Sequence, residues 1–155
     1  MELYIGGISQ GKLKFVCDTK GLARDSKDIC DGADCSLEDL LTRPVINHLH
    51  LFLKRLLTEG TERESDLHEI DFRSYPDLKE KVFSDPLHKA ETVMEELIVK
   101  NPSAVIICNE VGYGIVPMDR SDRIYRENVG RCLCRLAACS TSVVRIVCGL
   151  GMKIR

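Results

Sequence analysis

The fold class is indicated most directly by Leu3-Tyr4-Ile5-Gly6-Gly7-Ile8-Ser9-Gln10-Gly11-Lys12 near the start of the chain. Its first three residues are apolar, which indicates a short buried strand, and the glycines after them indicate a tight loop. Residues 12–19 can then form a helix, which Gly21 is well placed to end. A buried strand that passes through a glycine-rich loop into a helix is typical of an α/β domain.

The loop has the spacing of a phosphate-binding P-loop, G-x-x-x-x-G-K, and departs from it where Leu13 replaces Ser or Thr. Glycines in this pattern let backbone N–H groups surround phosphate oxygens, and Lys12 would reach the β- and γ-phosphates of a nucleotide. Because Leu13 has no hydroxyl for magnesium, phosphate binding should survive the replacement better than phosphoryl transfer. The alternative is a tight turn with a solvated lysine. We expect nucleotide contacts from Gly6, Gly7, Ile8, Ser9, Gln10, Gly11, Lys12 and Leu13.

Strand and helix patterns alternate along the rest of the chain. We expect strands at 28–32, 104–108 and 143–148, helices from Pro44 to about Gly60, from Ser84 to Asn101 and from Asp119 to about Cys139, and an exit loop at 149–153. In the last helix, Ile124, Val129, Cys132, Leu133 and Leu136 should face inward. The alternation predicts an α/β fold with a mostly parallel sheet and helices on both faces. The pattern is weak over 61–83, which we interpret as an irregular excursion.

Composition limits the kinds of protein that this chain can be. Its 155 residues suit a single domain over 1–155, and 44% hydrophobic with 30% charged residues is typical of a soluble globular protein. A net charge of -2 gives no basic field for a nucleic-acid partner. No apolar run reaches the roughly 18 residues of a membrane span, and no secretory signal is visible, so we expect a cytoplasmic protein. Eight cysteines without a C-x-x-C pair indicate core thiols.

Carboxylates follow two of the expected strands. Asp31 stands where a P-loop protein would hold Mg²⁺, and Asp34 is a second candidate ligand three residues on. The alternative is an ordinary Asp-Gly turn, with Asp34 capping the next segment. Glu110 could orient a nucleophilic hydroxyl or a metal-bound water. It could equally be a strand-end carboxylate that nearby N–H groups satisfy.

An arginine cluster follows Glu110 along the chain. Three of its members can share one helix face, and guanidinium groups bind phosphate bidentately. Acidic residues lie between them, so an ordinary salt-bridged surface is the alternative. As candidate contacts to substrate or phosphate we take Arg120, Arg123, Arg126 and Arg131.

From these residues the chain resembles the adenosylcobinamide kinase/adenosylcobinamide-phosphate guanylyltransferase family. The most specific match is Asn109-Glu110-Val111-Gly112-Tyr113-Gly114-Ile115-Val116-Pro117, which is similar to the family's N-E-V-G-x-G-I-V-P. The glycines and lysine of the P-loop are similar too, as is 149–153 to the closing G-x-G-x-K. Positions that also match the family are Arg120, Arg123, Arg126, Gly130-Arg131 and Arg135-Leu136-Ala137.

The resemblance implies a RecA-like P-loop NTPase fold and phosphorylation of the aminopropanol hydroxyl of a corrinoid, with GTP or ATP as donor and Mg²⁺. It also implies self-association into a homo-oligomer and a second activity, transfer of GMP through a guanylylated histidine. The family carries that histidine between the first helix and the acidic strand, where this chain has 21–28 and no His. The four histidines are His48, His50, His68 and His88. We expect His48 and His50, two apart on a helix, to be ordinary helix residues that face different sides.

Two hypotheses about function follow. In the first, the chain is a corrinoid kinase in which Lys12, Glu110 and Asp31 are catalytic: Lys12 stabilises the transferring phosphoryl group, Asp31 or Asp34 holds magnesium, and Glu110 positions the hydroxyl. Guanylyl transfer is then doubtful, because no nucleophile stands in the matching interval. In the second, the chain binds a nucleotide or a corrinoid phosphate and has lost the chemistry, as Leu13 suggests.

Overall fold

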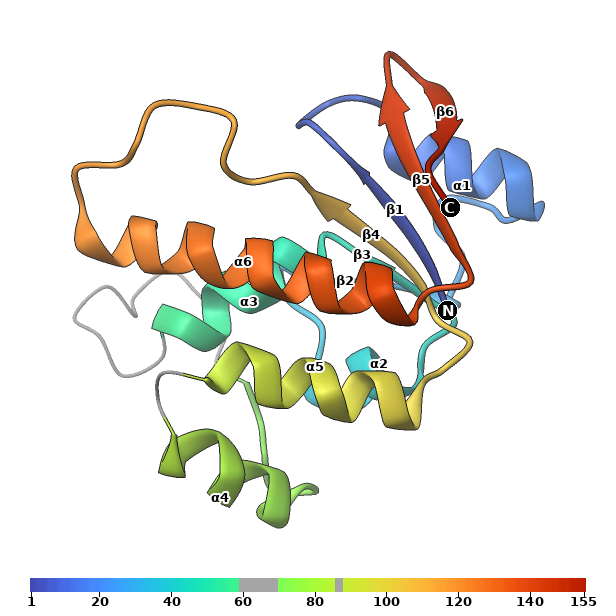
Figure 1. Ribbon diagram of the computed structural model, residues 1–155. Helices are drawn as coiled ribbons and strands as arrows, with labels where there is room; N and C mark the ends of the chain where they lie inside the picture. The colour runs from blue at the N-terminus through green and yellow to red at the C-terminus, as the bar shows by residue number, and fades with distance from the viewer. Residues whose placement is uncertain (59–69, 86–87) are drawn as a thin grey trace.

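The computed structural model describes residues 1–58, 70–85 and 88–155, which form a six-stranded sheet with helices on both faces (Figure 1). The strands are β1 (Glu2–Gly6), β2 (Ile29–Asp31), β3 (Val45–Asn47), β4 (Val105–Asn109), β5 (Ser142–Val147) and β6 (Leu150–Lys153). The helices are α1 (Lys12–Lys20), α2 (Leu37–Thr42), α3 (Leu49–Thr58), α4 (Pro76–Ser84), α5 (Lys89–Lys100) and α6 (Arg120–Cys139). The predicted α/β class is confirmed.

The sheet is parallel except at one edge. Its strand order is β2-β3-β4-β1-β5-β6, and the first five strands in this order run parallel, while β6 pairs antiparallel with β5. The interior strands β1 and β4 carry fully buried Leu3 and Ile106. Because five strands share one direction, the residues that follow them meet at a single edge, where open α/β sheets bind ligands.

The two faces of the sheet are covered unequally. Among the described helices, α2, α3, α5 and α6 cover one face, and α4 packs on α5, whereas α1 alone lies on the other face (Figure 1). The larger core contains Phe52 and Met94, both with no exposed surface. The smaller core joins Val16 of α1 to Tyr4 and Ile146 of the sheet. In the part of the chain that the structure describes, the helix on the second face is therefore the one that begins at the P-loop.

Glycines make the strand–loop–helix unit possible. A Cβ on Gly6 would lie 2.4 Å from the Ile146 carbonyl oxygen, so only glycine fits where β1 leaves the sheet. Gly11 has φ 79° at the start of α1, and Gly21, with φ 67°, ends the helix with its N–H donating to the Cys17 carbonyl. The predicted unit from strand to helix is thus confirmed.

One predicted helix is wrong at its beginning. The sequence suggested a helix from Pro44 through Ile46, but Val45–Asn47 is the parallel strand β3, and α3 begins at Leu49. Three residues are too few to show strand periodicity, and Ile46 has helical spacing to Leu49 and Leu53. Between strand and helix stands His48, with φ 52°.

Three other boundaries also differ from the predictions. Residues 61–69 of the supposed irregular excursion over 61–83 lie outside the described residues, but its last part forms most of the helix α4, Pro76–Ser84. Pro76, which lies in the segment of weak pattern, occupies the first helical turn, where proline is favoured. Ser84 therefore ends a helix, and α5 begins only at Lys89. The supposed exit loop at 149–153 contains the strand β6.

The last helix is as predicted in its bounds and its Asp119 cap, whose carboxylate accepts the Ser121 N–H. Val129, Cys132 and Leu136 are buried, but Ile124 is 43% exposed, so its predicted inward position is wrong. All eight cysteines are free thiols, five of them buried. Among the described residues, no helix has both the length and the apolar character needed to cross a bilayer.

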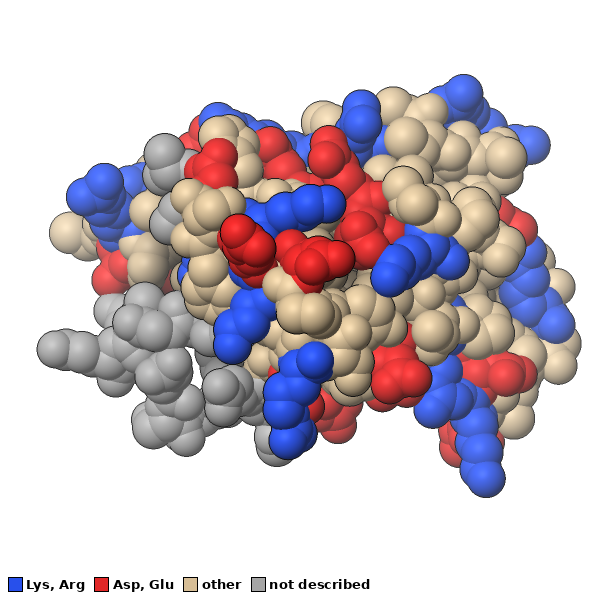
Figure 2. Space-filling model, turned by 90° about the horizontal axis from the view of Figure 1, so that it is seen from below, with Lys and Arg blue, Asp and Glu red and all other residues tan. Residues whose placement is uncertain are grey.

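Charged side chains of both signs are interspersed on the face shown in Figure 2, where acidic groups gather near the centre and lysines and arginines surround them. Charged side chains of the described residues also form ion pairs near the surface, such as Lys100 with Glu96 along α5 and Arg135 with Glu95 between α6 and α5. Pairs of this kind contribute little to stability. The described part of this face therefore carries no continuous field of one sign.

Candidate functional site

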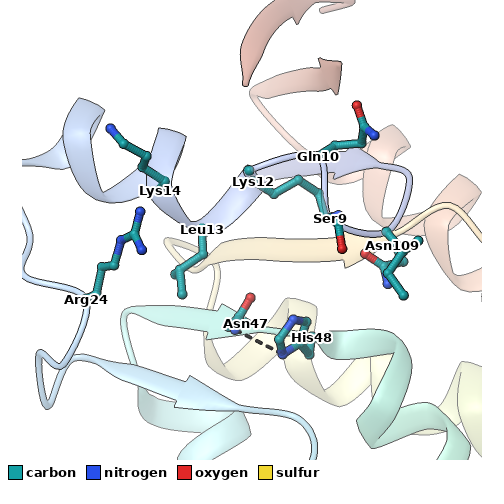
Figure 3. A pocket seen from close by; sticks show the side chains of 11 residues that line it. Ser9, Gln10, Lys12, Leu13, Lys14, Arg24, Asn47, His48 and Asn109 are labelled. Carbon is teal, nitrogen blue, oxygen red and sulfur yellow. Dashed lines mark hydrogen bonds between the residues drawn. The ribbon is translucent and has the colours of Figure 1, made fainter. Parts of the chain in front are cut away.

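A cavity of about 310 Å³ opens at the carboxyl edge of the sheet, between the P-loop and the ends of β3 and β4 (Figure 3). It is the place where the sequence predicted phosphate binding. The residues that line it are Ile8, Ser9, Gln10, Gly11, Lys12, Leu13, Lys14, Arg24, Asn47, His48 and Asn109. Six of these belong to the predicted nucleotide-binding loop, and the other five come from α1, from the segment after it and from the ends of β3 and β4.

Lys12 is the buried cation of this cavity. Its side chain is 6% exposed, and its Nζ donates to the Gly7 carbonyl at 2.6 Å. Burial lowers the pKa of Lys12, and negative charge at Cys108 and Glu110 opposes the shift. Among the described residues, the backbone N–H groups of Ile8, Ser9 and Gly11 meet no hydrogen-bond acceptor. The loop thus combines a desolvated ammonium with free amide donors, which suits a polyanion.

The turn between β5 and β6 holds the P-loop from the other side. The Gln10 side-chain carbonyl accepts the Cys148 N–H at 2.7 Å, and its backbone carbonyl accepts the Gly149 N–H at 2.9 Å. Ser9 has φ 57°, an uncommon conformation for a residue with a side chain. The loop is therefore fixed by contacts outside itself before any ligand binds.

Asp31, Asn47 and His48 form a hydrogen-bonded group at the ends of β2 and β3, which lie side by side with Asp31 paired to Asn47. His48 Nδ1 lies 2.8 Å from one Asp31 carboxylate oxygen, and Asn47 Nδ2 donates to the same oxygen at 3.1 Å. Burial raises the pKa of Asp31, but the bonds from His48 and from the Ala33 amide outweigh it and lower that pKa. The expectation that His48 is an ordinary helix residue is wrong, since it precedes α3 and lines the cavity.

His50 supports the neighbouring wall from inside. It is 7% exposed, and its Nε2 lies 2.9 Å from the side-chain nitrogen Nδ2 of Asn109, a residue that lines the cavity. Burial and the nearby charges of His48 and Lys12 lower the pKa of His50 to about 4, so its ring is neutral at pH 7. His48 and His50 do not face opposite sides, because their rings meet edge to face, with centroids 5.6 Å apart.

Glu110 lies beside the cavity rather than in its wall. Its carboxylate accepts the Arg145 Nε–H at 3.0 Å, and its side chain is 12% exposed. The Arg145 guanidinium also lies over the Tyr113 ring, 5.5 Å from its centroid. The catalytic role of Glu110 stays a prediction, and the structure shows its carboxylate engaged with an arginine.

The predicted arginine cluster lines a second, more open hollow of about 640 Å³ between α6 and the loop after β4. Three of its four members line that hollow: Arg123, Arg126 and Arg131. Arg123 donates to the carbonyls of Pro117 and Met118, and Arg126 donates to that of Gly112.

Arg131 pairs with Glu127 and Glu91. Arg120 is outside the lining of both cavities. Contact of these four arginines with substrate therefore stays a prediction, and in this structure three of them hold parts of the protein.

Arg24 was missed by the sequence analysis. It lies in the segment between α1 and β2, lines the cavity opposite Leu13 (Figure 3), and makes no ion pair with another described residue. Nothing in the sequence separates it from other exposed arginines. Only the packing of that segment beside the P-loop brings the Arg24 charge to the wall of the cavity.

The cavity offers magnesium few ligands. Leu13 points into it without an oxygen (Figure 3), and Asp34 is exposed and outside its lining. The Asp31 carboxylate is already hydrogen-bonded to His48 and Asn47. Among the described residues, no three His, Cys, Asp or Glu side chains come together as a metal site. Magnesium ligation by Asp31 and Asp34 stays a prediction.

Comparison with known proteins identifies the family of the chain. The family profile described as "Cobinamide kinase / cobinamide phosphate guanyltransferase" matches residues 24–154. The chain is 47% identical over 51 residues to the bifunctional adenosylcobalamin biosynthesis protein CobU of Salmonella typhimurium, and 45% identical over 51 residues to that of Escherichia coli. Each match covers 33% of this chain and 28% of the relative. Since the family profile spans most of the sequence, the chain belongs to the cobinamide kinase / cobinamide phosphate guanyltransferase family, which has a P-loop NTPase fold.

Proposed function

We propose that this protein transfers the terminal phosphoryl group of GTP or ATP to the hydroxyl of a corrinoid alcohol, adenosylcobinamide, in cobalamin biosynthesis. The observation that carries the proposal is the cavity beside Lys12. Its loop offers backbone donors that no other described residue uses, and its lysine is buried and already placed. Family membership supports the choice of a corrinoid as substrate.

The roles of the residues follow from their positions. The loop amides and Lys12 bind the β- and γ-phosphates, where charge builds up as the phosphoryl group leaves. Arg24 and Lys14 add positive charge at the outer wall. Asn109 and His48 lie across the cavity from the loop (Figure 3), on the side from which an acceptor hydroxyl can approach.

Magnesium fits this site only as a partner of the nucleotide. The ion supplies charge neutralisation at the phosphates and usually keeps several of its waters. With no oxygen on Leu13, we propose that phosphate oxygens and water carry the ion, and we give it no protein ligand. Arg24 then supplies part of the charge that a tightly bound ion would supply.

Guanylyl transfer is not part of the proposal. The relatives that match the chain are described as bifunctional, but the interval 21–28, where the family resemblance places a nucleophilic histidine, has none. Self-association also stays a prediction, which size-exclusion chromatography with light scattering would test. We expect a cytoplasmic location, because GTP and ATP are available there.

The test is direct. Purified protein is incubated with Mg²⁺, adenosylcobinamide and either GTP or ATP, and the corrinoid is analysed by mass spectrometry. A corrinoid that gains one phosphate supports the kinase. Nucleotide that binds without any product would instead favour the second candidate, a nucleotide- or corrinoid-phosphate-binding protein, which the loss of an oxygen at Leu13 makes the main alternative.

A further inference from the structure

His48 has an orientation that a surface histidine does not need. Its Nδ1 lies 2.8 and 3.1 Å from the two Asp31 carboxylate oxygens. Asn47 Nδ2 also lies 3.1 Å from this Nδ1, but it donates to the Asp31 carboxylate. Because an ionised carboxylate can only accept hydrogen bonds, we assign the proton of the neutral ring to Nδ1 and the lone pair to Nε2. With the ring held in this tautomer, Nε2 is the basic atom.

The backbone at His48 is also unusual. It has φ 52°, a left-handed conformation that is uncommon outside glycine, although histidine, like asparagine and aspartate, adopts it more often than other residues do. Gly32 keeps it there: its N–H donates to the Asn47 carbonyl at 2.8 Å, and a Cβ on it would lie 2.3 Å from the His48 carbonyl oxygen. Strained residues of this kind cluster at functional sites.

The neighbouring Asn47 points to a ligand independently. It is 3% exposed and lines the cavity, yet its Oδ1 has no hydrogen-bond partner among the described residues. An unpaired buried acceptor is costly, and native structures seldom keep one without a reason. In Figure 3 its carboxamide lies beside the His48 ring, so the two side chains face the same space.

A second histidine in the chain shows which features are distinctive. His88 Nδ1 lies 2.8 Å from an Asp85 carboxylate oxygen, the same distance as in the His48–Asp31 pair. His88, however, has φ -112° and lines neither cavity. The pairing alone is therefore ordinary. What sets His48 apart is its position opposite the P-loop, next to an unpaired acceptor.

We propose that His48 is a catalytic residue of the phosphoryl transfer, an inference that rests on the proposed function. Its Nε2 accepts the proton of the substrate hydroxyl while the hydroxyl oxygen forms a bond to the terminal phosphorus of the nucleotide. The bond from that phosphorus to the bridging oxygen breaks, and the nucleoside diphosphate leaves. The proton then passes from Nε2 to solvent. Asp31 is a positioning residue that holds the ring, and Asn47 Oδ1 accepts a second donor of the substrate.

This assignment places His48, and not Glu110, next to the substrate hydroxyl. The Glu110 carboxylate accepts a bond from Arg145 and lies outside the cavity lining, whereas His48 is within it. A base must come within hydrogen-bonding reach of the proton that it takes, and His48 meets the geometric requirement better.

The experiment compares variants of His48 that can adopt its left-handed backbone conformation. His48→Asn keeps a donor to Asp31 and a residue that tolerates this conformation, but it removes Nε2. His48→Gly also fits the backbone and leaves the space of the ring empty. His88→Asn is the matched control, because it breaks the other His–Asp pair. Turnover of adenosylcobinamide and the Kd of a fluorescent GTP analogue are measured for each protein.

We expect both His48 variants to lower kcat by at least about 100-fold, within the range of general base catalysis, with the nucleotide Kd changed by less than about threefold. Free imidazole should raise the rate of His48→Gly by at least about tenfold and leave His48→Asn unchanged. Asp31→Asn should lower kcat and leave KM nearly constant. His88→Asn should match the wild type.

The outcomes separate the two proposals. If the wild type forms product and the His48 variants form it equally fast, the catalytic role of His48 is wrong and the kinase function stands. A phosphate or nucleotide attached to His48, seen by intact-protein mass spectrometry, would make it a nucleophile and overturn its role as base. If the wild type forms no product, the proposed function fails and the role of His48 fails with it.

Discussion

Residues 7–11 follow β1 and residues 110–118 follow β4, and since Gly6 pairs with Asn109 the two loops leave the sheet side by side. The first loop is held through Gln10 by the β5–β6 turn and covers a lysine that is 6% exposed. The second exposes its apolar side chains, with Ile115 and Met118 both 97% exposed. Its carbonyls are bound from outside, by Arg123 and Arg126.

The two loops differ in how firmly they are held, and this difference fits the roles that we propose for them. Backbone donors can stabilise a transferring phosphoryl group only if they are already in place, so the first loop must be fixed before the ligand arrives. The second loop depends on a few side-chain bonds from α6, and substitutions there should have smaller effects. Four predictions test this contrast, in order of decreasing effect.

The largest effect is expected at the root of the first loop. Gly6→Ala would place a methyl group 2.4 Å from the Ile146 carbonyl oxygen, so the variant should lose more than about 3 kcal/mol of stability or fail to fold. Gly114→Ala is the control in the second loop, because a Cβ there meets no atom within 4 Å. Chemical denaturation measures both variants. Equal stabilities would show that the two loops are equally tolerant.

The second effect concerns Lys12. Lys12→Met removes the buried ammonium while retaining a chain of similar length, and it should weaken nucleotide binding by at least about 100-fold. Lys20→Met, at the far end of α1 where the lysine pairs with Glu2, is the control. Titration with a fluorescent nucleotide gives both affinities. Affinity retained by Lys12→Met would mean that the loop does not bind the phosphates.

A smaller gain is expected from Leu13→Ser. The added hydroxyl supplies an oxygen ligand at the start of α1, and the affinity for Mg·GTP should rise by about tenfold. Leu13→Ala, which also shortens the side chain but adds no oxygen, should show no such gain. Measuring GTP binding with and without Mg²⁺ separates ligation from space. Identical behaviour of the two variants would refute the idea of a missing ligand.

The smallest effect is expected in the second loop. Arg126→Gln removes the bond to the Gly112 carbonyl and should cost about 1 kcal/mol, seen as faster amide hydrogen exchange over 112–118. Lys153→Gln, on β6, serves as a control for the loss of one positive charge. If the binding free energy of the substrate falls by more than the loss of about 1 kcal/mol expected for the loop, the predicted phosphate contact of Arg126 is supported.

The comparison also explains what the sequence could predict. The first loop was predictable because Gly6 and Gly11 stand at sites that strongly disfavour any other residue, and glycines at this spacing can be recognised in a single sequence. The second loop was identified by resemblance, and its bonds to Arg123 and Arg126 have no local signal. For the same reason Arg24 could not be distinguished from any other exposed arginine.

The group around His48 was missed because one short strand was missed. Val45–Asn47 has apolar residues that fit the helical spacing of α3 equally well, and a left-handed histidine cannot be inferred from residue type. Once β3 is known to lie parallel to β2, the register pairs Asp31 with Asn47 and brings the next residue, His48, to the same edge. Asp31 and His48 are 17 positions apart in the sequence, and the pairing of the two strands brings them together.

The bond from the Cys148 N–H to Gln10 has a practical consequence, because the Cys148 thiol is exposed at the same turn. An environment-sensitive dye on that sulfur would sit next to the loop that we propose binds phosphate. After replacement of the other exposed thiols, Cys134 and Cys139, its fluorescence would report nucleotide binding in real time, without a labelled ligand. The exposed Cys148 thiol is thus a natural attachment site for a dye that reports nucleotide binding.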